Sequence, residues 1–441
     1  MSHRQSRREF LKASALVGAG FWVGPRLVAK GASPNEKLNV AVVGIEGQGR
    51  WNVGELAAAG ANLVALCDVD EPRTAAVRAE FPKADFVVDY RRLLDRKDID
   101  AVLIATPDHH HAPATMLALK AGKHVYCEKP LAHTVEEART VAKQAVKSKL
   151  TTQMGTQIHA GSNYRRVVEL IRAGAIGPIE EVHVWVGTVW GGQKRPPEAP
   201  VPEGLHWDLW LGPAPVRPYA KDVYVPAMWR SWWDFGGGGL ADMACHHVDL
   251  SFWALDLRYP KTVAAEGPPV DADSCPRWMI VRYEFPARKD MPPVKLTWYH
   301  GGKRPPLIAP PRDSNRPRPA GDKRFEWGDG TLFIGKKGML LAGYDNHKLL
   351  PEDDFKDFKP PEPSIPDSIG HHREWIEACK TGKPTTCNFD YSGALTEAVL
   401  LGNVAYRTGK RLEWDPAALK ATNVPEADQY LQHKFREGWT L

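Results

Sequence analysis

Asp242 and His246 are the residues whose types and spacing first indicate chemistry. They are four positions apart, so on a helix their side chains leave the same face about one turn from each other. An imidazole titrates near neutral pH and can accept a proton, while a nearby carboxylate can hold a hydroxyl or orient other groups. Four glycines at 236–239 precede the pair and let the backbone approach another surface closely. The alternative is a satisfied Asp–His pair on a packed helix.

A second candidate site is the glycine-rich segment after the first apolar run. Gly44 and Gly49 fit the spacing Gly-x-Gly-x-x-Gly, in which backbone N–H groups and a helix N-terminus hold a pyrophosphate. Glu46 occupies the middle glycine position, and its carboxylate would face phosphate unless it turned away. We therefore expect Gly47 to be the point of closest approach.

Strand-like and helical patterns alternate around this segment. The apolar runs cover residues 39–44, 62–68, 101–106, 124–128 and 151–156. Their alternation with amphipathic stretches predicts a parallel sheet covered by helices. Asp68 ends the second run, where an acidic side chain can accept hydrogen bonds from both ribose hydroxyls and repel a 2′-phosphate. NAD is therefore predicted over NADP, although a tight turn followed by a helix-capping Asp would explain these residues alone.

Two further motifs carry a family resemblance. With Glu128-Lys129-Pro130, the chain resembles the Gfo/Idh/MocA family, the glucose–fructose oxidoreductase and inositol dehydrogenase group, over nearly all of residues 36–410. The family's Thr-Pro…His pattern falls on Thr106, Pro107 and His111, with Asp108 where Asn is commoner. The resemblance implies an α/β protein: an N-terminal Rossmann dinucleotide-binding domain and a C-terminal α/β domain with a large, mostly antiparallel sheet.

The motifs and the family resemblance together predict that the chain divides into four segments. It comprises an export segment at 1–32, a dinucleotide-binding domain at 36–156, a substrate and oligomerisation domain at 157–415 and a tail at 416–441. The predicted cofactor-binding residues are Gly44, Gly47, Gly49, Asp68, Thr106, Pro107, His111, Glu128 and Lys129. Family resemblance also implies a homodimer or homotetramer.

For catalysis, the resemblance implies that an Asp-x-x-x-His motif faces the nicotinamide together with the Lys of Glu-Lys-Pro. Here these residues are Lys129, Asp242 and His246. Oxidising a secondary alcohol by hydride transfer needs a base for the hydroxyl proton, a role that suits His246. Lys129 can hold the same oxygen and spread its developing charge, and Asp242 can orient the others. Which of the lysine and the histidine finally holds the proton is left open by the sequence.

Candidate substrate contacts follow the first domain. Gln157 and His159 come directly after its last strand, at the junction where α/β sheets place ligands. Trp232 and Trp233 precede the glycine run, and indole rings stack on the C–H faces of sugars, although most tryptophans serve as core or interface anchors. We predict these four side chains as contacts of a carbohydrate substrate.

The rest of the substrate half alternates between regular and irregular stretches. Helical patterns cover residues 164–172, 371–380 and 393–407. We expect Arg165 and Arg166 on the outer face of the first of these helices. Residues 189–228 and 301–330 lack periodicity, and loops of that length are usually functional or interfacial. They could cover the cleft or reach a neighbouring subunit, and the tail after Trp414 is predicted to wrap back over the surface.

Composition narrows the class of protein. With 441 residues, 43% of them hydrophobic, and only six cysteines, the chain is a globular protein without a disulfide framework. Residues 1–32 hold six bases and one acid, so the +5 net charge lies there and the remainder has 52 bases and 52 acids. Nothing in this charge favours a nucleic acid or membrane partner. No Cys-x-x-Cys pair is present, and no metal site is predicted.

The first residues resemble an export signal. Ser6-Arg7-Arg8-Glu9-Phe10-Leu11-Lys12 precedes an apolar stretch, 13–23, that is too short to span a bilayer. This resembles a twin-arginine signal, which would bring the folded protein to the translocase and then to the periplasm or beyond the cytoplasm. Proteins on this route commonly load a cofactor before export. A chance basic amphipathic helix is the alternative.

Together these observations predict an NAD-dependent oxidoreductase acting on a secondary hydroxyl of a sugar, cyclitol or sugar derivative. Because free NAD is scarce outside the cytoplasm, we expect a tightly bound cofactor. A redox-neutral glycosidase or lyase, working by transient oxidation and elimination, is the first alternative. A non-catalytic nucleotide-binding protein is the second, and Glu46 in the phosphate turn is the feature that favours it.

Overall fold

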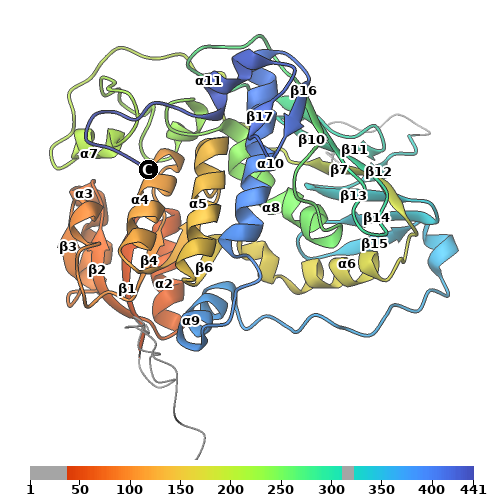
Figure 1. The fold of residues 1–441 in the computed structure, drawn as a ribbon, viewed down its shortest axis with the longest axis horizontal. Helices are drawn as coiled ribbons and strands as arrows, with labels where there is room; N and C mark the ends of the chain where they lie inside the picture. Colours follow the sequence, from red (N-terminus) through yellow and green to blue (C-terminus); the bar gives the residue numbers. More distant parts are fainter. Residues whose placement is uncertain (1–36, 310–321) are drawn as a thin grey trace, which may run out of the picture.

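The computed structural model describes residues 37–309 and 322–441, so the predicted export segment lies outside the described residues. The first half is a six-stranded sheet of order β3-β2-β1-β4-β5-β6 whose pairs are all parallel (Figure 1). Its strands are β1 (Asn39–Val43), β2 (Asn62–Cys67), β3 (Asp85–Val87), β4 (Ala101–Ile104), β5 (His124–Glu128) and β6 (Thr152–Gly155). The strand order reverses between β1 and β4, where doubly wound folds bind ligands. The Rossmann prediction is confirmed, apart from the three-residue strand β3, which is too short to show periodicity.

Helices cover both faces of this sheet. They are α2 (Gln48–Ala58), α3 (Glu71–Glu80), α4 (Asp108–Lys120) and α5 (Val135–Ser148). Alternate residues of β1 belong to different cores: Ala41 and Val43 pack into the one that contains α4 and α5, and Val40 and Val42 into the other. Burial on both faces explains why these strands read as continuous apolar runs.

The second half is a nine-stranded sheet of order β15-β14-β13-β7-β10-β9-β8-β16-β17. Its strands are β7 (Ile179–Trp185), β8 (Thr262–Glu266), β9 (Met279–Phe285), β10 (Val294–His300), β13 (Gly330–Gly335), β14 (Gly338–Ala342), β15 (His347–Leu350), β16 (Leu412–Asp415) and β17 (Lys420–Ala421). The β7–β10 pair is parallel and the other pairs are antiparallel, which confirms the large, mostly antiparallel sheet.

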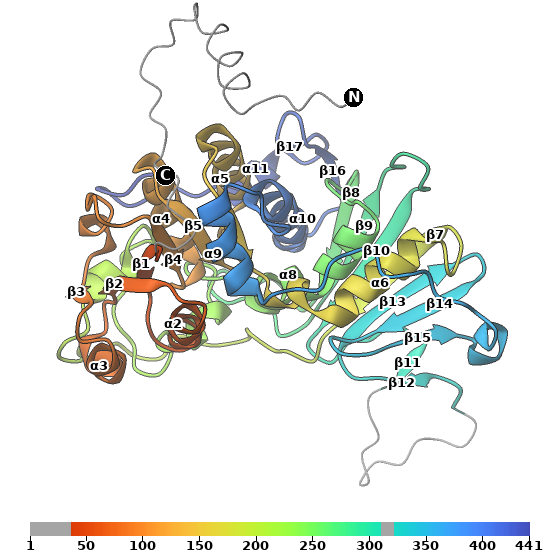
Figure 2. The same cartoon turned by 90° about the horizontal axis from the view of Figure 1, so that it is seen from below.

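Three helices, α6 (Ser162–Arg172), α8 (Gly238–Ala254) and α10 (Phe389–Thr408), lie along one face of this second sheet (Figure 2). Helix α5 of the first half packs along α10, and a Cβ on Gly393 would lie 2.6 Å from Cβ of Ala142. Arg139 crosses the same interface, where its Nη2 lies 2.8 Å from Oε2 of Glu397. The two halves therefore pack directly against each other through α5 and α10.

The remaining elements are one eleven-residue helix and several shorter segments. They are α7 (Trp207–Leu211), α9 (His371–Thr381), α11 (Asp428–Leu431), β11 (Ile308–Ala309), β12 (Phe325–Glu326) and the 3₁₀ helices Tyr90–Arg92, Gln157–Ala160, Met228–Ser231, Glu352–Phe355 and Pro425–Ala427. Within 37–309 and 322–441, no helix combines the length and apolarity needed to cross a bilayer.

The expectation for Arg165 is wrong. Its side chain is buried, and one guanidinium nitrogen lies 2.7 Å from Oε1 of Glu374 while another binds the carbonyl oxygen of Pro366. The chain between β15 and α9 returns across α6 and covers the face that we expected to be exposed.

Candidate active site

The glycine turn between β1 and α2 has the shape of a phosphate-binding loop. Gly44 has φ +79°, and a Cβ there would lie 2.5 Å from the carbonyl oxygen of Ala105. A Cβ on Gly49 would lie 2.0 Å from the carbonyl oxygen of Gly44, so both positions require glycine. Gly47, at φ +59°, caps α2 and has no atom within 4 Å of where a Cβ would be. The backbone is therefore open to a ligand at Gly47 and the N-terminus of α2.

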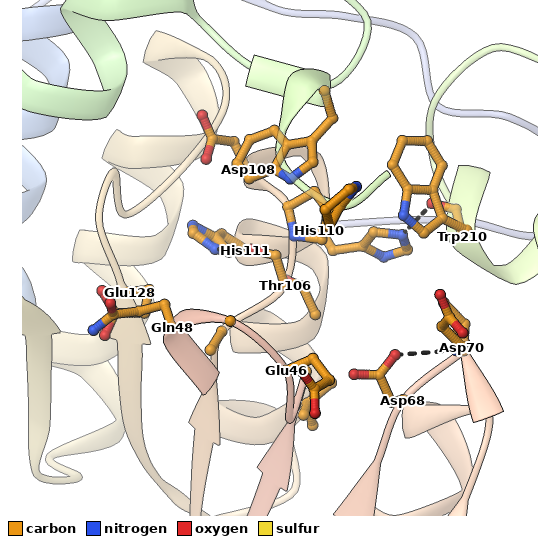
Figure 3. Close-up of a pocket in the computed structure, with 18 of the residues that line it drawn as sticks. Glu46, Gln48, Asp68, Asp70, Thr106, Asp108, His110, His111, Glu128 and Trp210 are labelled. Atoms are coloured by element: carbon orange, nitrogen blue, oxygen red, sulfur yellow. Dashed lines mark hydrogen bonds between the residues drawn. The ribbon is translucent and has the colours of Figure 1, made fainter. Parts of the chain in front are cut away.

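A cavity of about 500 Å³ opens above this turn (Figure 3). Its volume lies in the range of small-molecule and cofactor sites. Of the predicted cofactor and catalytic residues, it is lined by Gly44, Gly47, Asp68, Thr106, Pro107, His111, Glu128, Lys129 and His246. Gly49 supports the turn from beneath without lining the cavity, and Asp242 lies just behind Lys129.

One end of the cavity carries two carboxylates. Asp68 accepts hydrogen bonds from the N–H groups of Ile45 (2.9 Å) and Asp70 (3.1 Å), while its burial raises its pKa from the ordinary value. Figure 3 shows Glu46 on the Asp68 side of the turn and Gln48 on the opposite side. Oε1 of Glu46 is buried and has no hydrogen-bond partner among the described residues. The carboxylate of Glu46 therefore turns away from the helix N-terminus, where it would have opposed a phosphate.

Glu128, at the end of β5, connects the first sheet to helix α2 and to the 3₁₀ helix that follows β6. Its Oε1 accepts hydrogen bonds from Nδ2 of Asn52 (2.9 Å) and Nε2 of Gln157 (2.8 Å). Gly155 makes room for this carboxylate, because a Cβ there would lie 2.5 Å from it. Burial raises the pKa of Glu128. The arrangement fixes the end of β5 and therefore the position of the next residue, Lys129.

Lys129 reaches across to helix α8. Its Nζ donates to the backbone carbonyl of Asp242 at 2.6 Å and to Oδ1 of Asp242 at 2.7 Å. Nε of Arg230 donates to the same Oδ1 at 2.9 Å, and Nε1 of Trp190 donates to Oδ2 at 2.7 Å. Burial alone would raise the pKa of Asp242, but Lys129 and Arg230 outweigh it and hold that pKa well below its usual range. Asp242 is thus a charged anchor for three donors.

His246 lies one turn further along α8. Its Nδ1 is buried and has no hydrogen-bond partner in the part of the chain that the structure describes. Burial, followed by the charge of Lys129 and the proximity of His247, holds its pKa well below the usual value for histidine. The imidazole is therefore neutral near pH 7 and can accept a proton. Lys129 and His246, 117 positions apart in the sequence, line one cavity.

The two predicted substrate contacts after the first sheet lie in different places. Gln157 lines the cavity, where its amide also donates to the hydroxyl of Tyr126 at 2.9 Å. His159 is fully buried outside the cavity: its Nδ1 lies 2.9 Å from Oδ2 of Asp249, and its ring stacks on Trp253 with centroids 4.0 Å apart. The structure therefore offers no route for His159 to touch a ligand in this cavity.

The two predicted tryptophans are also internal. Trp232 donates to the carbonyl of Val223 (2.9 Å) and Trp233 to that of Asp271 (3.1 Å), and neither lines the cavity. The 3₁₀ helix Met228–Ser231 instead presents Trp229 and Arg230 to it. The tryptophan-rich segment reaches the cavity through Trp229 instead, because the 3₁₀ turn sets which side chains face inward.

Two segments that sequence reasoning left without assigned contacts also line the cavity. From the loop 189–228, Trp210 lines it, and Nε2 of His110 lies 2.9 Å from the carbonyl oxygen of Trp210. From the tail, Trp439 lines it, with its ring centroid 5.6 Å from that of His110. Nε of Arg436 donates to the carbonyl of Gly212 at 2.9 Å and so ties tail to loop. The only sequence signals were the aperiodic loop and the expectation of a returning tail.

Comparisons with known proteins agree with this geometry. The profile of an oxidoreductase family with an NAD-binding Rossmann fold, Gfo/Idh/MocA, matches residues 38–156, and the profile of that family's C-terminal α/β domain matches residues 177–290. The chain belongs to the Gfo/Idh/MocA oxidoreductase family. Its first half is an NAD-binding Rossmann domain, and the glycine turn described above is where this fold holds the cofactor.

Curated proteins with similar sequences match this chain over only part of their length. The alpha-N-acetylgalactosaminidase of Shewanella oneidensis is 29% identical over 205 residues, covering 40% of this chain and 45% of the relative. The 1,5-anhydro-D-fructose reductase of Ensifer adhaerens is 32% identical over 127 residues, covering 29% of this chain and 38% of the relative. Each match thus spans less than half of the relative.

Solved structures share the fold. The WlbA dehydrogenase from Bordetella pertussis, in complex with NADH and UDP-GlcNAcA, superposes with a TM-score of 0.60 at 18% identity, covering 86% of this chain and 99% of that chain. The levoglucosan dehydrogenase, in complex with NADH and levoglucosan, superposes with a TM-score of 0.58 at 17% identity, covering 83% and 97%. Identities this low establish the architecture alone.

Proposed function

We propose that this protein oxidises a secondary hydroxyl of a sugar, cyclitol or sugar derivative, with NAD held in this cavity throughout. The observation that carries the proposal is that Lys129, from the Rossmann half, and His246, from the substrate half, line the cavity above the glycine turn. NAD, when bound, supplies the hydride acceptor. The open backbone at Gly47 fits its pyrophosphate, and the carboxylates of Glu46 and Asp68 fit ribose hydroxyls.

The protein's own groups can manage the proton. His246 is neutral and lines the cavity, so it is the group prepared to accept the hydroxyl proton. Lys129 donates a hydrogen bond to the same oxygen and spreads its growing negative charge. Asp242 holds the ammonium of Lys129 from behind, with Arg230 as a second cation, so the donor is positioned before substrate arrives.

A redox-neutral glycosidase or lyase is the second candidate. Oxidation at one sugar carbon would acidify the adjacent C–H, and elimination would break the glycosidic bond and release the aglycone as an alcohol. In the glycosidase, water would then add to the resulting unsaturated ketone, and in either case the hydride would finally return to the sugar carbonyl. Two observations favour it. Trp210 and Trp439 line the cavity and would help to retain a cofactor that need not be exchanged, and the relative from Shewanella oneidensis is named a glycosidase. Export by the twin-arginine route, which we also propose, would favour retention for the same reason.

One experiment separates these functions. Full-length protein is purified after folding in the cytoplasm, its bound nicotinamide is measured by absorbance and mass, and it is then given free sugars and aryl glycosides. Net NADH formation supports the dehydrogenase, and glycoside cleavage without net NADH supports the redox-neutral route. Absence of bound nucleotide together with absence of turnover would overturn both and leave a binding protein.

A further inference from the structure

A second cavity, of about 670 Å³, lies beside the catalytic helix α8. It is formed where α8 meets the segment before β13 and the turn between β14 and β15. Its lining residues are Met243, His247, Glu326, Trp327, Gly328, Asp329, Gly343, Tyr344, Asp345 and Asn346. Neither NAD nor the proposed proton transfer uses any of them.

Helical geometry places the two cavities next to each other. Successive residues of an α-helix are rotated by about 100°, so Asp242, His246, Met243 and His247 follow one another around α8 at about 0°, 40°, 100° and 140°. His246 lines the first cavity, and Met243 and His247 line the second. His246 and Met243 are both half-buried on a helix that is otherwise almost wholly buried. A ligand oxidised beside His246 could therefore extend around the helix into the second cavity.

The second cavity has the chemistry of a sugar subsite. Trp327 and Tyr344 supply aromatic rings, which pack on the C–H faces of a pyranose. Asp329, Asp345 and Asn346 supply oxygens that accept hydrogen bonds from hydroxyls. Acidic residues alone would not indicate a sugar site. Here the oxygen-bearing side chains lie beside aromatic rings, in a cavity whose volume is in the range of small-molecule sites.

His247 adds an independent indication of a ligand. It is buried and lines the cavity, its ring stacks on Tyr344 with centroids 4.6 Å apart, and its Nε2 lies 2.9 Å from the hydroxyl oxygen of Tyr344. Its Nδ1 is buried without a hydrogen-bond partner among the described residues. Burial lowers the pKa of His247 to about 3, so the imidazole stays neutral. One nitrogen is thus left to bond with a hydroxyl.

Charge narrows the ligand class. The first cavity is lined by the cations Lys129 and Arg230 beside His246, whereas no Lys or Arg of residues 37–309 or 322–441 lines the second. Like charges brought together across an interface cost several kcal/mol. An anionic sugar unit would meet the carboxylates of Asp329 and Asp345 in this lining, while a neutral or amino sugar would not be repelled by them.

We propose that this second cavity binds a neutral or amino sugar unit, linked to the sugar that is oxidised beside His246, and excludes uronates and sugar phosphates. The inference rests on the proposed function, since it extends the substrate of that site. It makes the preferred substrate a glycoside of at least two units or with a bulky neutral aglycone, and Trp327 and Asp345 the residues that select it.

The test uses the NAD-loaded, full-length protein with matched probes: neutral disaccharides, their component monosaccharides, and the corresponding uronate and sugar phosphate. Affinity is measured directly by saturation-transfer NMR and calorimetry, and turnover separately. Neutral disaccharides should bind more tightly than their monosaccharides and than the anionic probes. Trp327→Ala should weaken disaccharide binding about fivefold to tenfold, the scale of an aromatic packing contact, without changing monosaccharide binding or NAD content.

Trp278→Ala is the matched control, because this tryptophan lies outside both cavities. Asp345→Asn, a milder change at an exposed position, should raise affinity for the uronate and so keeps the test open if Trp327→Ala does not fold. Equal binding of the neutral and anionic probes, or no effect of Trp327→Ala on disaccharides, overturns the subsite. If the proposed function were wrong, the result would be different: the protein would hold no NAD, or its turnover would not depend on Lys129, regardless of which sugars it binds.

Discussion

The Nζ of Lys129 lies 2.6 Å from the backbone carbonyl oxygen and 2.7 Å from Oδ1 of Asp242. This double contact connects the end of strand β5 in the NAD-binding sheet to the first turns of helix α8. The carbonyl bond depends on the position of the helix backbone, and the carboxylate bond depends on the charge state of Asp242. Lys129 is therefore positioned by both halves of the protein at once.

Lys129→Ala is expected to lower turnover by roughly 100-fold or more, the scale of losing a charge-stabilising or acid–base group. Bound NAD, measured by mass, should remain, since the glycine turn and Asp68 are untouched. Lys147→Ala, at an exposed position of α5, serves as the control. Turnover within a few-fold of the wild type would show that Lys129 does not act on the reacting oxygen.

The acid limb of the pH profile is expected below the ordinary histidine range. The pKa of His246 is depressed by burial and by Lys129, so its proton-accepting form persists as pH falls from 8 to 6 and is lost only as pH passes through the depressed value. The profile of kcat/KM should thus show no midpoint near 6.5 from this group. In Lys129→Ala the removal of a neighbouring cation should move the limb upward, and an unmoved limb would assign it to another residue.

The parts of the fold that could be predicted from sequence are those set by local pattern. The strands of the first sheet are buried on both faces and appear as continuous apolar runs, and the four-residue spacing of Asp242 and His246 required only that their segment be helical. The family motif brought in Lys129. None of these needed knowledge of which distant segments meet.

The missed residues are those placed by tertiary packing alone. Trp190 reaches Asp242 across 52 positions, and Trp439 reaches the cavity from the last residues of the chain. Neither lies in a periodic segment, so no spacing argument could orient it. Tertiary packing also decides where His159 lies. Its position after β6 suits a ligand contact, but its contacts with Asp249 and Trp253 hold the side chain inside the protein.

Glu46 is expected to enforce the choice of NAD over NADP. Its buried, unpartnered Oε1 lies at the Asp68 end of the cavity, where a carboxylate accepts bonds from ribose hydroxyls and repels a 2′-phosphate. Glu46→Gly should weaken NAD binding and strengthen NADP binding, with the ratio of dissociation constants changing by about tenfold or more. Arg73 lines the same cavity and would offer the 2′-phosphate a cation once Glu46 is gone. Dissociation constants from fluorescence titration decide this, and an unchanged ratio would assign selectivity to Asp68 alone.

Trp439 is expected to slow the release of the cofactor. Its ring meets that of His110 edge-on and lies under the guanidinium of Arg91, which is 4.5 Å from the ring centroid. Trp439→Ala should raise the NAD dissociation rate about tenfold, consistent with the loss of one packed aromatic contact. Phe435→Ala is a matched control, because this aromatic residue lies in the same tail but outside the cavity. Stopped-flow displacement measures the rate, and identical rates in the two variants would mean that the tail does not retain NAD.

Asp108→Asn is expected to stabilise the protein, and more so at pH 8 than at pH 5. Asp108 is 3% exposed, and burial raises its pKa to about 8 even though Arg230 and Lys129 favour its charged form. A carboxyl whose folded pKa lies above its unfolded pKa gives full stability only below the unfolded value, and stability is lost as pH rises toward the folded one.

The loss per group is roughly 1.4 kcal/mol for each pH unit between the two values, that is, between about 4 and 8. Asparagine fills the same volume, can still accept the N–H bond of Gly237, and has no proton to lose. Denaturant unfolding of the apoprotein at pH 5 and pH 8 measures the difference, with Asp353→Asn, at an exposed position, as the control. An equal gain at both pH values would mean that Asp108 is ionised in the folded protein and is stabilised by Lys129 and Arg230. The cavity would then carry one more negative charge than the burial of Asp108 indicates.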